Sequence, residues 1–243
     1  MRILQLNTWT GRIQGAIQRF LSNHDFDVIC LQEAVWSENR KELLELFSTS
    51  VEQIKKASGL EYDHRVATYY FDAFGGRIEQ GNVVICRFPI KEAEAVHLLG
   101  EYTRINDVYD NNGLDYQAQK IVLENGLVVV NYHGYWQKDP IGNETTIECM
   151  RKVADLIRDE ERPVIMCGDL NVASESPAMR ELDFLHDLTA ENNVKQTLQN
   201  IKFVRDVACD HILINDKIKA NNFSVYDDLL SDHKAISAEI EII

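Results

Sequence analysis

Apolar residues gather in short runs that recur along the whole chain, and the polar stretches between them are seldom long. Most runs are rich in Val, Ile and Leu, and their lengths are typical of β-strands. They predict strands at residues 3–9, 28–32, 65–71, 83–87, 118–123, 127–133, 164–167, 211–215 and 235–242. This number of strands is enough for at least two sheets.

Apolar positions three and four residues apart predict helices between these strands. One helix is expected from Ser37, as N-cap, to about Lys56, and a second over residues 144–158. Asn125-Gly126 lies between two apolar runs and predicts a tight hairpin. Residues 101–117 lack a clear period and are expected to form a long surface loop.

The chain is long enough to bury a large core without help from disulfides. It has 243 residues, of which 45% are hydrophobic. No linker, repeat or low-complexity tract interrupts the pattern, so residues 1–243 are expected to form a single domain.

Charge narrows the class of partner. There are 25 basic and 39 acidic side chains, which give a net charge of −14. Such a surface repels a long polyanion, so non-specific tracking along nucleic acid is disfavoured. A short nucleic acid, a nucleotide or a small phosphorylated molecule remains compatible with this charge.

Five cysteines are scattered without CxxC spacing, mostly in or beside apolar runs. They are expected to be reduced packing residues with inert thiols. No apolar leader and no stretch long enough to span a bilayer is visible. We therefore expect a cytoplasmic protein, without a membrane span, that is a monomer.

Polar side chains of a particular kind stand where the apolar runs end. Each has an ordinary explanation by itself: Glu33 as the first solvated residue of a loop, or His133 as a half-buried histidine. Together they favour an active site, because strand ends hold catalytic groups within a narrow tolerance. The candidates are Asn7, Glu33, His133, Asp169 with Asn171, Asp210, and Asp232 with His233.

At these positions the chain resembles the endonuclease/exonuclease/phosphatase superfamily. The similar motifs are LNTW (6–9), LQE (31–33), NYH (131–133), GDLN (168–171), CDHIL (209–213) and SDH (231–233), in the order that the family has them. The run GNVVICRFPI (81–90) is similar to a further strand of the family, and Asn82 in it is expected to contact the substrate.

The resemblance implies an α/β fold, a four-layer α/β sandwich of two mixed β-sheets packed face to face with helices outside. It also implies that Glu33 is the principal ligand of Mg²⁺, with Asn7 and Asp232 close by. Hard oxygen ligands suit Mg²⁺ or Mn²⁺ rather than zinc.

The same resemblance implies the roles of the other candidates. Asp169 would handle the attacking water and Asn171 would stabilise charge on the phosphoryl oxygens. His233, oriented by Asp210, would act together with Asp169 on the attacking water. His133 would protonate the leaving group. Whether Asp169 or His233 takes the proton from water is left open.

These residues predict a Mg²⁺-dependent phosphoester hydrolase, either a phosphodiesterase or a nuclease. The alternatives are a phosphomonoesterase acting on a sugar or lipid phosphate, and a non-catalytic binding module that has kept the fold. An inositol phosphate is disfavoured because His211 and Val172-Ala173 depart from the motifs of that branch. Tyr135 and Trp136 are expected either to stack on a base or sugar or only to pack their loop.

Overall fold

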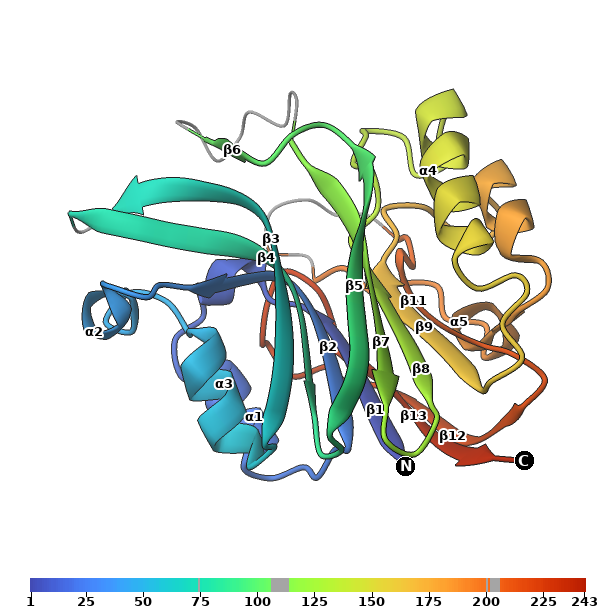
Figure 1. The fold of residues 1–243 in the computed structure, drawn as a ribbon, viewed down its shortest axis with the longest axis horizontal. Helices are drawn as coiled ribbons and strands as arrows, with labels where there is room; N and C mark the ends of the chain where they lie inside the picture. Colours follow the sequence, from blue (N-terminus) through green and yellow to red (C-terminus); the bar gives the residue numbers. More distant parts are fainter. Residues whose placement is uncertain (74, 106–113, 200, 202–205) are drawn as a thin grey trace.

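A computed structural model describes residues 1–73, 75–105, 114–199, 201 and 206–243. Two mixed β-sheets pack face to face, and helices cover their outer sides (Figure 1). The α/β sandwich expected from the sequence is therefore confirmed. Of the helices in the described residues, none has the length and apolar character needed to cross a bilayer.

The first sheet has seven strands, all antiparallel to their neighbours except in the β1–β2 and β3–β6 pairs. In spatial order these strands are β12 (Ile218–Val225), β13 (Ile236–Ile242), β1 (Arg2–Asn7), β2 (Val28–Trp36), β4 (Gly76–Cys86), β3 (Tyr62–Ala73) and β6 (Thr103–Arg104).

In the described part of the chain the second sheet has six strands, of which only β8 and β9 run parallel. Its spatial order is β10 (His186–Asp187), β11 (Asp210–Ile214), β9 (Val164–Asp169), β8 (Val128–Tyr132), β7 (Tyr116–Leu123) and β5 (Ile90–Leu99). The hairpin predicted at Asn125-Gly126 joins β7 to β8, and Gly126 supplies the positive φ of 86° that the turn needs.

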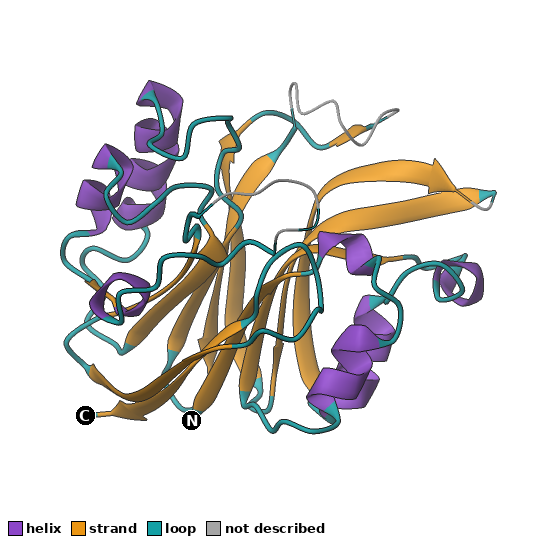
Figure 2. Ribbon diagram, turned by 180° about the vertical axis from the view of Figure 1, so that it is seen from behind, coloured by secondary structure: helices purple, strands orange, loops and turns teal. Residues whose placement is uncertain are grey.

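Helices lie on opposite outer faces of the sandwich (Figure 2). On the first sheet these are α1 (Ala16–Leu21) and α3 (Val51–Ser58), and on the second α4 (Glu144–Asp155), the 3₁₀ helix η2 (Pro177–Leu182) and α5 (Leu188–Glu191). Apolar clusters fill the space between the sheets and the space under each set of helices. This layering holds the strand ends in fixed positions.

The prediction of a single helix over residues 37–56 is wrong. The chain forms two shorter helices, α2 (Lys41–Leu44) and α3, and Ser50 rather than Ser37 caps the longer one. The Ser50 hydroxyl accepts from the Gln53 backbone, and the Gln53 side chain accepts from the Ser50 backbone. This reciprocal cap starts a new helix in the middle of the apolar stripe.

Part of the expected loop at 101–117 forms β6 and the start of β7, while residues 106–113 lie outside the described residues. All five cysteines are free and buried. Burial raises the pKa of the Cys86 thiol to about 12, which keeps it protonated and unreactive. The expectation of reduced packing cysteines is confirmed.

Candidate active site

The polar strand ends meet at the end of the sandwich opposite the two chain termini (Figure 1). β1 runs from the N-terminus to Asn7, and β9 ends on Asp169. Asp210 opens β11 directly opposite Asp169 in the ladder. His133 follows β8, which is parallel to β9, and so lies at the same edge. Packing of the two sheets therefore brings together residues more than 200 positions apart.

Glu33 is aimed by a bulge in β2. The pairing between β2 and β4 is regular up to Leu31 and resumes at Ala34, and Glu33 has a φ of 51°. A positive φ is unfavourable for a residue with a side chain, and bulges commonly redirect a side chain beside an active site. The Glu33 carboxylate consequently faces the amide of Asn7, which donates to Oε1 over 3.3 Å.

Asn7 joins carboxylates from both sheets. Its Nδ2 donates to Glu33 on the first sheet and to Oδ2 of Asp169, on the second, over 3.0 Å. Its Oδ1 accepts from the backbone N–H of Trp9 over 3.0 Å, which fixes the orientation of the amide. One amide thus holds two acidic groups close together.

Asp169 is the centre of this arrangement and is only 1% exposed. Its Oδ1 accepts from the backbone N–H of Asn171 over 3.1 Å, and its Oδ2 lies 3.5 Å from Nε2 of His133 and 3.6 Å from Nε2 of His233. Burial alone would raise the pKa of Asp169, but the charge of His233 and the contacts with His133 and Asn7 lower it. Asp169 is therefore ionised at neutral pH.

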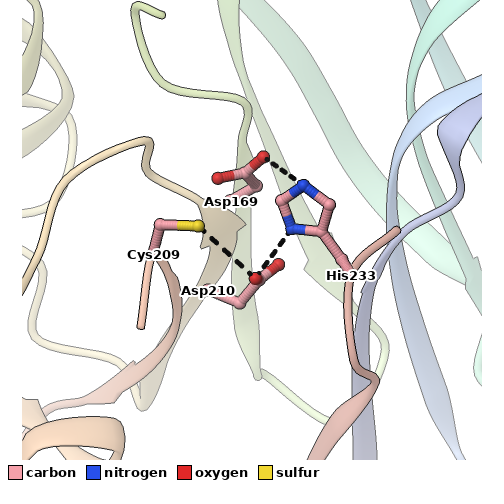
Figure 3. Close-up of side chains that lie close together, drawn as sticks. All are labelled: Asp169, Cys209, Asp210 and His233. Atoms are coloured by element: carbon pink, nitrogen blue, oxygen red, sulfur yellow. Dashed lines mark hydrogen bonds and ion pairs between the residues drawn. The ribbon is translucent and has the colours of Figure 1, made fainter. Parts of the chain in front are cut away.

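His233 lies between two buried carboxylates (Figure 3). Its Nδ1 is 2.9 Å from Oδ2 of Asp210, and its Nε2 faces Asp169. Burial alone would lower the pKa of His233, but the charges of Asp210 and Asp169 raise it well above the usual value. The resting imidazole is therefore protonated and donates from Nδ1 to Asp210.

His133 approaches Asp169 from a more open side. Its side chain is 25% exposed, compared with 10% for His233. Burial would lower the pKa of His133, but the hydrogen bond and charge of Asp169, with the charge of Glu33, raise it. A partly exposed, protonated imidazole is the form that can give a proton to a departing group.

Asn171 is held in the left-handed region, at a φ of 56°. Its Nδ2 donates to the carbonyl of Gly134 over 3.0 Å, and the Gly134 N–H donates in turn to the carbonyl of Asp169. A Cβ on Gly134 would lie 2.1 Å from the carbonyl oxygen of Leu170, so only glycine permits this approach. The loops after β8 and β9 are thereby fixed to each other.

The remaining expected residues differ in their surroundings. Asp232 accepts from the Ser231 hydroxyl over 3.2 Å. Asn82 is buried and donates to the Gln117 carbonyl over 3.0 Å. Tyr135 packs edge-on against Tyr116, whereas Trp136 is 49% exposed. The roles of Asp232, Asn82, Tyr135 and Trp136 stay predictions.

Several side chains next to the site were not singled out from the sequence. Tyr69 and Tyr116 lie close enough to Glu33 that its charge adds to burial in raising their pKa, that of Tyr116 to about 12. Gln5 donates to Oδ1 of Asp210 over 3.1 Å. Gln5 is a polar position within an apolar strand, a signal that marks it as unusual without identifying its partner.

A buried cluster of acidic residues and histidine could bind a metal ion. Asp169, Cys209, Asp210 and His233 have donor atoms within 4.8 Å of one another. Burial raises the pKa of the Cys209 thiol, so this sulfur stays protonated and is a poor ligand. The oxygens of Glu33 and Asp169 beside Asn7 are the harder donor set and fit a divalent cation such as Mg²⁺.

A family model described as the endonuclease/exonuclease/phosphatase family matches residues 4–233. The match therefore covers nearly the whole chain, including every candidate residue from Asn7 to His233. No curated protein matches the sequence.

Solved structures with the same fold come from bacteria and animals. An endonuclease/exonuclease/phosphatase from Bacteroides vulgatus has a TM-score of 0.71 at 17% identity, covering 100% of this chain and 98% of its own. A mannosyl-6-phosphatase from Bacteroides thetaiotaomicron has a TM-score of 0.67 at 18% identity, covering 100% of both chains. TDP2 from D. rerio, complexed with single-strand DNA product, has a TM-score of 0.68 at 12% identity over 99% of this chain and 98% of its own.

Proposed function

Since this chain belongs to the endonuclease/exonuclease/phosphatase family, we propose that it is a Mg²⁺-dependent phosphodiesterase that cleaves its substrate by attack of water. The family generally consists of hydrolytic phosphoesterases that depend on divalent metals. The observation that carries the proposal is the convergence of His133, His233 and the Asn7 amide on a single oxygen, Oδ2 of Asp169.

The metal would be held by Glu33, with Asn7 and Asp232 beside it. Glu33 and Asp169 place two carboxylates around one amide, and a divalent cation would offset this concentration of negative charge. When bound, Mg²⁺ would supply charge that stabilises the phosphoryl oxygens during attack.

Asp169 and His233 would manage the proton of the attacking water. In the resting state Asp169 is ionised and His233 is protonated, so of the two only Asp169 can accept a proton. This charge state favours Asp169 as the first acceptor, while the His233 cation keeps it ionised. Asp210 holds His233 in the required orientation through Nδ1.

His133 would deliver a proton to the leaving oxygen. It is the more exposed of the two histidines, and its raised pKa favours the protonated form. Asn171 would donate to a phosphoryl oxygen once a substrate displaces its present bond to the Gly134 carbonyl.

Asn82, Tyr135 and Trp136 would bind the rest of the substrate. Asn82 has an unpaired Oδ1 among the described residues, which can accept from a hydroxyl or amino group. Trp136 presents an exposed ring for a base or sugar. Tyr135, which packs edge-on against Tyr116, would support the Trp136 ring.

The test is hydrolysis of bis(p-nitrophenyl) phosphate with Mg²⁺, with EDTA, and by Asp169→Asn with Mg²⁺. We expect turnover by the wild type with Mg²⁺ and at least a 100-fold loss in the other two. Undiminished turnover with EDTA or by Asp169→Asn would contradict the mechanism.

A phosphomonoesterase is the second candidate, favoured by the mannosyl-6-phosphatase that shares this fold over its full length. Matched assays with p-nitrophenyl phosphate and its diester separate the two. A kcat/KM at least tenfold higher on the monoester would replace the phosphodiesterase proposal. Normal Mg²⁺ binding without turnover of any phosphoester would instead indicate a binding module.

A further inference from the structure

Four amide side chains are buried between the two sheets, in a layer that is otherwise largely apolar. Gln5 on β1 and Gln32 on β2 come from the first sheet, and Gln119 on β7 and Asn131 on β8 come from the second. All four are 0% exposed. Buried amides are costly unless their donors and acceptors are paired, so their partners show what they are for.

The amides form one continuous chain of hydrogen bonds. Gln5 and Gln32 exchange a pair of bonds of 2.7 and 2.8 Å. Gln32 then donates to Oδ1 of Asn131 over 2.6 Å, and Asn131 donates to Oε1 of Gln119 over 3.1 Å. Gln119 donates to Nδ1 and to the backbone carbonyl of His64, each over 2.8 Å.

The other end of this chain is the catalytic pair. Nε2 of Gln5 also donates to Oδ1 of Asp210 over 3.1 Å. The second oxygen of the same carboxylate, Oδ2, is bonded to Nδ1 of His233 over 2.9 Å. Asp210 is 0% exposed, so solvent does not reach it and Gln5 holds the side opposite His233.

The orientation of Gln5 is set by its neighbours. Its amide nitrogen serves both Oε1 of Gln32 and Oδ1 of Asp210, and its oxygen accepts from Gln32. If the amide turned over, its oxygen would face the Asp210 carboxylate, and the exchange with Gln32 would be lost. A network in which each member fixes the next permits a single arrangement.

We propose that Gln5 is a positioning residue for the Asp210–His233 pair, kept in place by the amide chain through Gln32 and Asn131. This inference rests on the proposed function for its effect on turnover, because the pair serves the proton of the attacking water. Its geometric part, the fixed rotation of the Asp210 carboxylate, stands without any activity.

The experiment compares Gln5→Met, which keeps the length of the side chain but cannot donate, with Asn215→Ala. Asn215 follows β11 at the end opposite Asp210, and its side chain pairs with the Val164 N–H and the Arg162 carbonyl. The Asn215→Ala variant therefore controls for the general effect of removing polar contacts. The readouts are kcat and KM on the diester, and the proton NMR signal of His233 Nδ1–H, assigned by its absence in His233→Gln.

We expect Gln5→Met to lower kcat by about 10- to 100-fold with KM within about twofold, and to shift the His233 signal. Asn215→Ala should leave both readouts unchanged. If Gln5→Met does not fold, Gln32→Met gives a second test, because it leaves Gln5 present but free to rotate. It should also shift the His233 signal.

A folded Gln5→Met protein with unchanged kcat and an unchanged His233 signal would overturn the inference. The same conclusion follows if Asn215→Ala lowers kcat as much as Gln5→Met. A wild type that hydrolyses no phosphoester, together with a shifted signal in Gln5→Met, would remove the proposed function and leave the positioning role supported.

Discussion

His233 and Asp210 form a buried hydrogen bond of 2.9 Å between Nδ1 and Oδ2. This bond leaves only Nε2 of the imidazole to face Asp169. The orientation of His233 therefore depends on a carboxylate that does not itself face the reacting group.

Asp210→Asn is the direct test of this dependence. The amide introduced by Asp210→Asn would lack the negative charge that keeps His233 protonated. It could also turn its Nδ2 donor, in place of an acceptor, toward Nδ1 of His233. We expect kcat to fall by about 10²- to 10⁴-fold with little change in KM. Steady-state kinetics measure the effect, and circular dichroism checks the fold. A kcat within twofold of the wild type would contradict the assigned role.

Glu33→Gln tests the metal site. The amide keeps the shape of the side chain but removes the charge that attracts a divalent cation. We expect the Mg²⁺ concentration for half-maximal activity to rise at least tenfold, with partial recovery at high Mg²⁺. The control is Glu45→Gln, which alters a carboxylate bonded to Ser50 away from the site. An unchanged Mg²⁺ requirement in Glu33→Gln would remove Glu33 as the ligand.

His133→Gln separates proton donation from substrate binding. A p-nitrophenolate leaves without a proton, whereas an alkoxide needs one. We expect His133→Gln to lose about 10²- to 10⁴-fold on an alkyl diester but less than tenfold on the activated ester. Equal losses on both substrates would count against a general acid. Rates on the two diesters by the same enzyme provide the internal control.

The ion pair of His211 and Asp187 predicts a pH dependence of the stability of the fold. His211 is 0% exposed, and its ring nitrogens lie 3.0 Å from Asp187 Oδ2 and 3.0 Å from the Val172 carbonyl. Both partners are acceptors, so the imidazole is doubly protonated. Burial would lower the pKa of His211, but the charge and hydrogen bond of Asp187 raise it, with smaller contributions from the Val172 carbonyl and the charge of Asp210.

A raised pKa in the folded state stabilises the protein below the unfolded value of about 6.5, and this contribution is lost as pH rises through the folded pKa. His211→Gln should lower the free energy of unfolding by about 3 kcal/mol near pH 6, because it leaves Asp187 without its ion-pair partner. The difference from wild type should shrink at higher pH. Urea unfolding between pH 5 and 9 measures it, and a pH-independent difference would refute the ion pair.

Much of the site was visible in the sequence because apolar strand runs end abruptly on polar residues. Asn7, Asp169 and Asp210 were found this way, and the structure brings them together. The rest depends on packing between distant segments. Nothing near Gln5 in the chain indicates that Gln32 and Asp210 will be its partners.

The strands that were not predicted are those with weak apolar patterns. Within the described residues β5 pairs only with β7, at the edge of the second sheet, and most of its side chains are exposed. Charged residues such as Lys91, Glu92 and Glu94 therefore interrupt the apolar pattern that would predict a strand. The expected helix at 37–56 failed for the opposite reason. Leu43 and Phe47 fit a helical stripe but are 41% and 60% exposed, and only Leu44 of α2 is buried.

The buried amides also fix how the two sheets are aligned relative to each other. Apolar faces in contact discriminate poorly between neighbouring alignments, because one methyl group replaces another with little loss. If one sheet were shifted along the other by one residue, roughly 3.3 Å, the hydrogen bond from Gln32 to Asn131 would break. Both amides would then be left without this partner in an apolar layer. The residues of the candidate site come from both sheets, so they meet only in the alignment of the sheets in which these amides are paired.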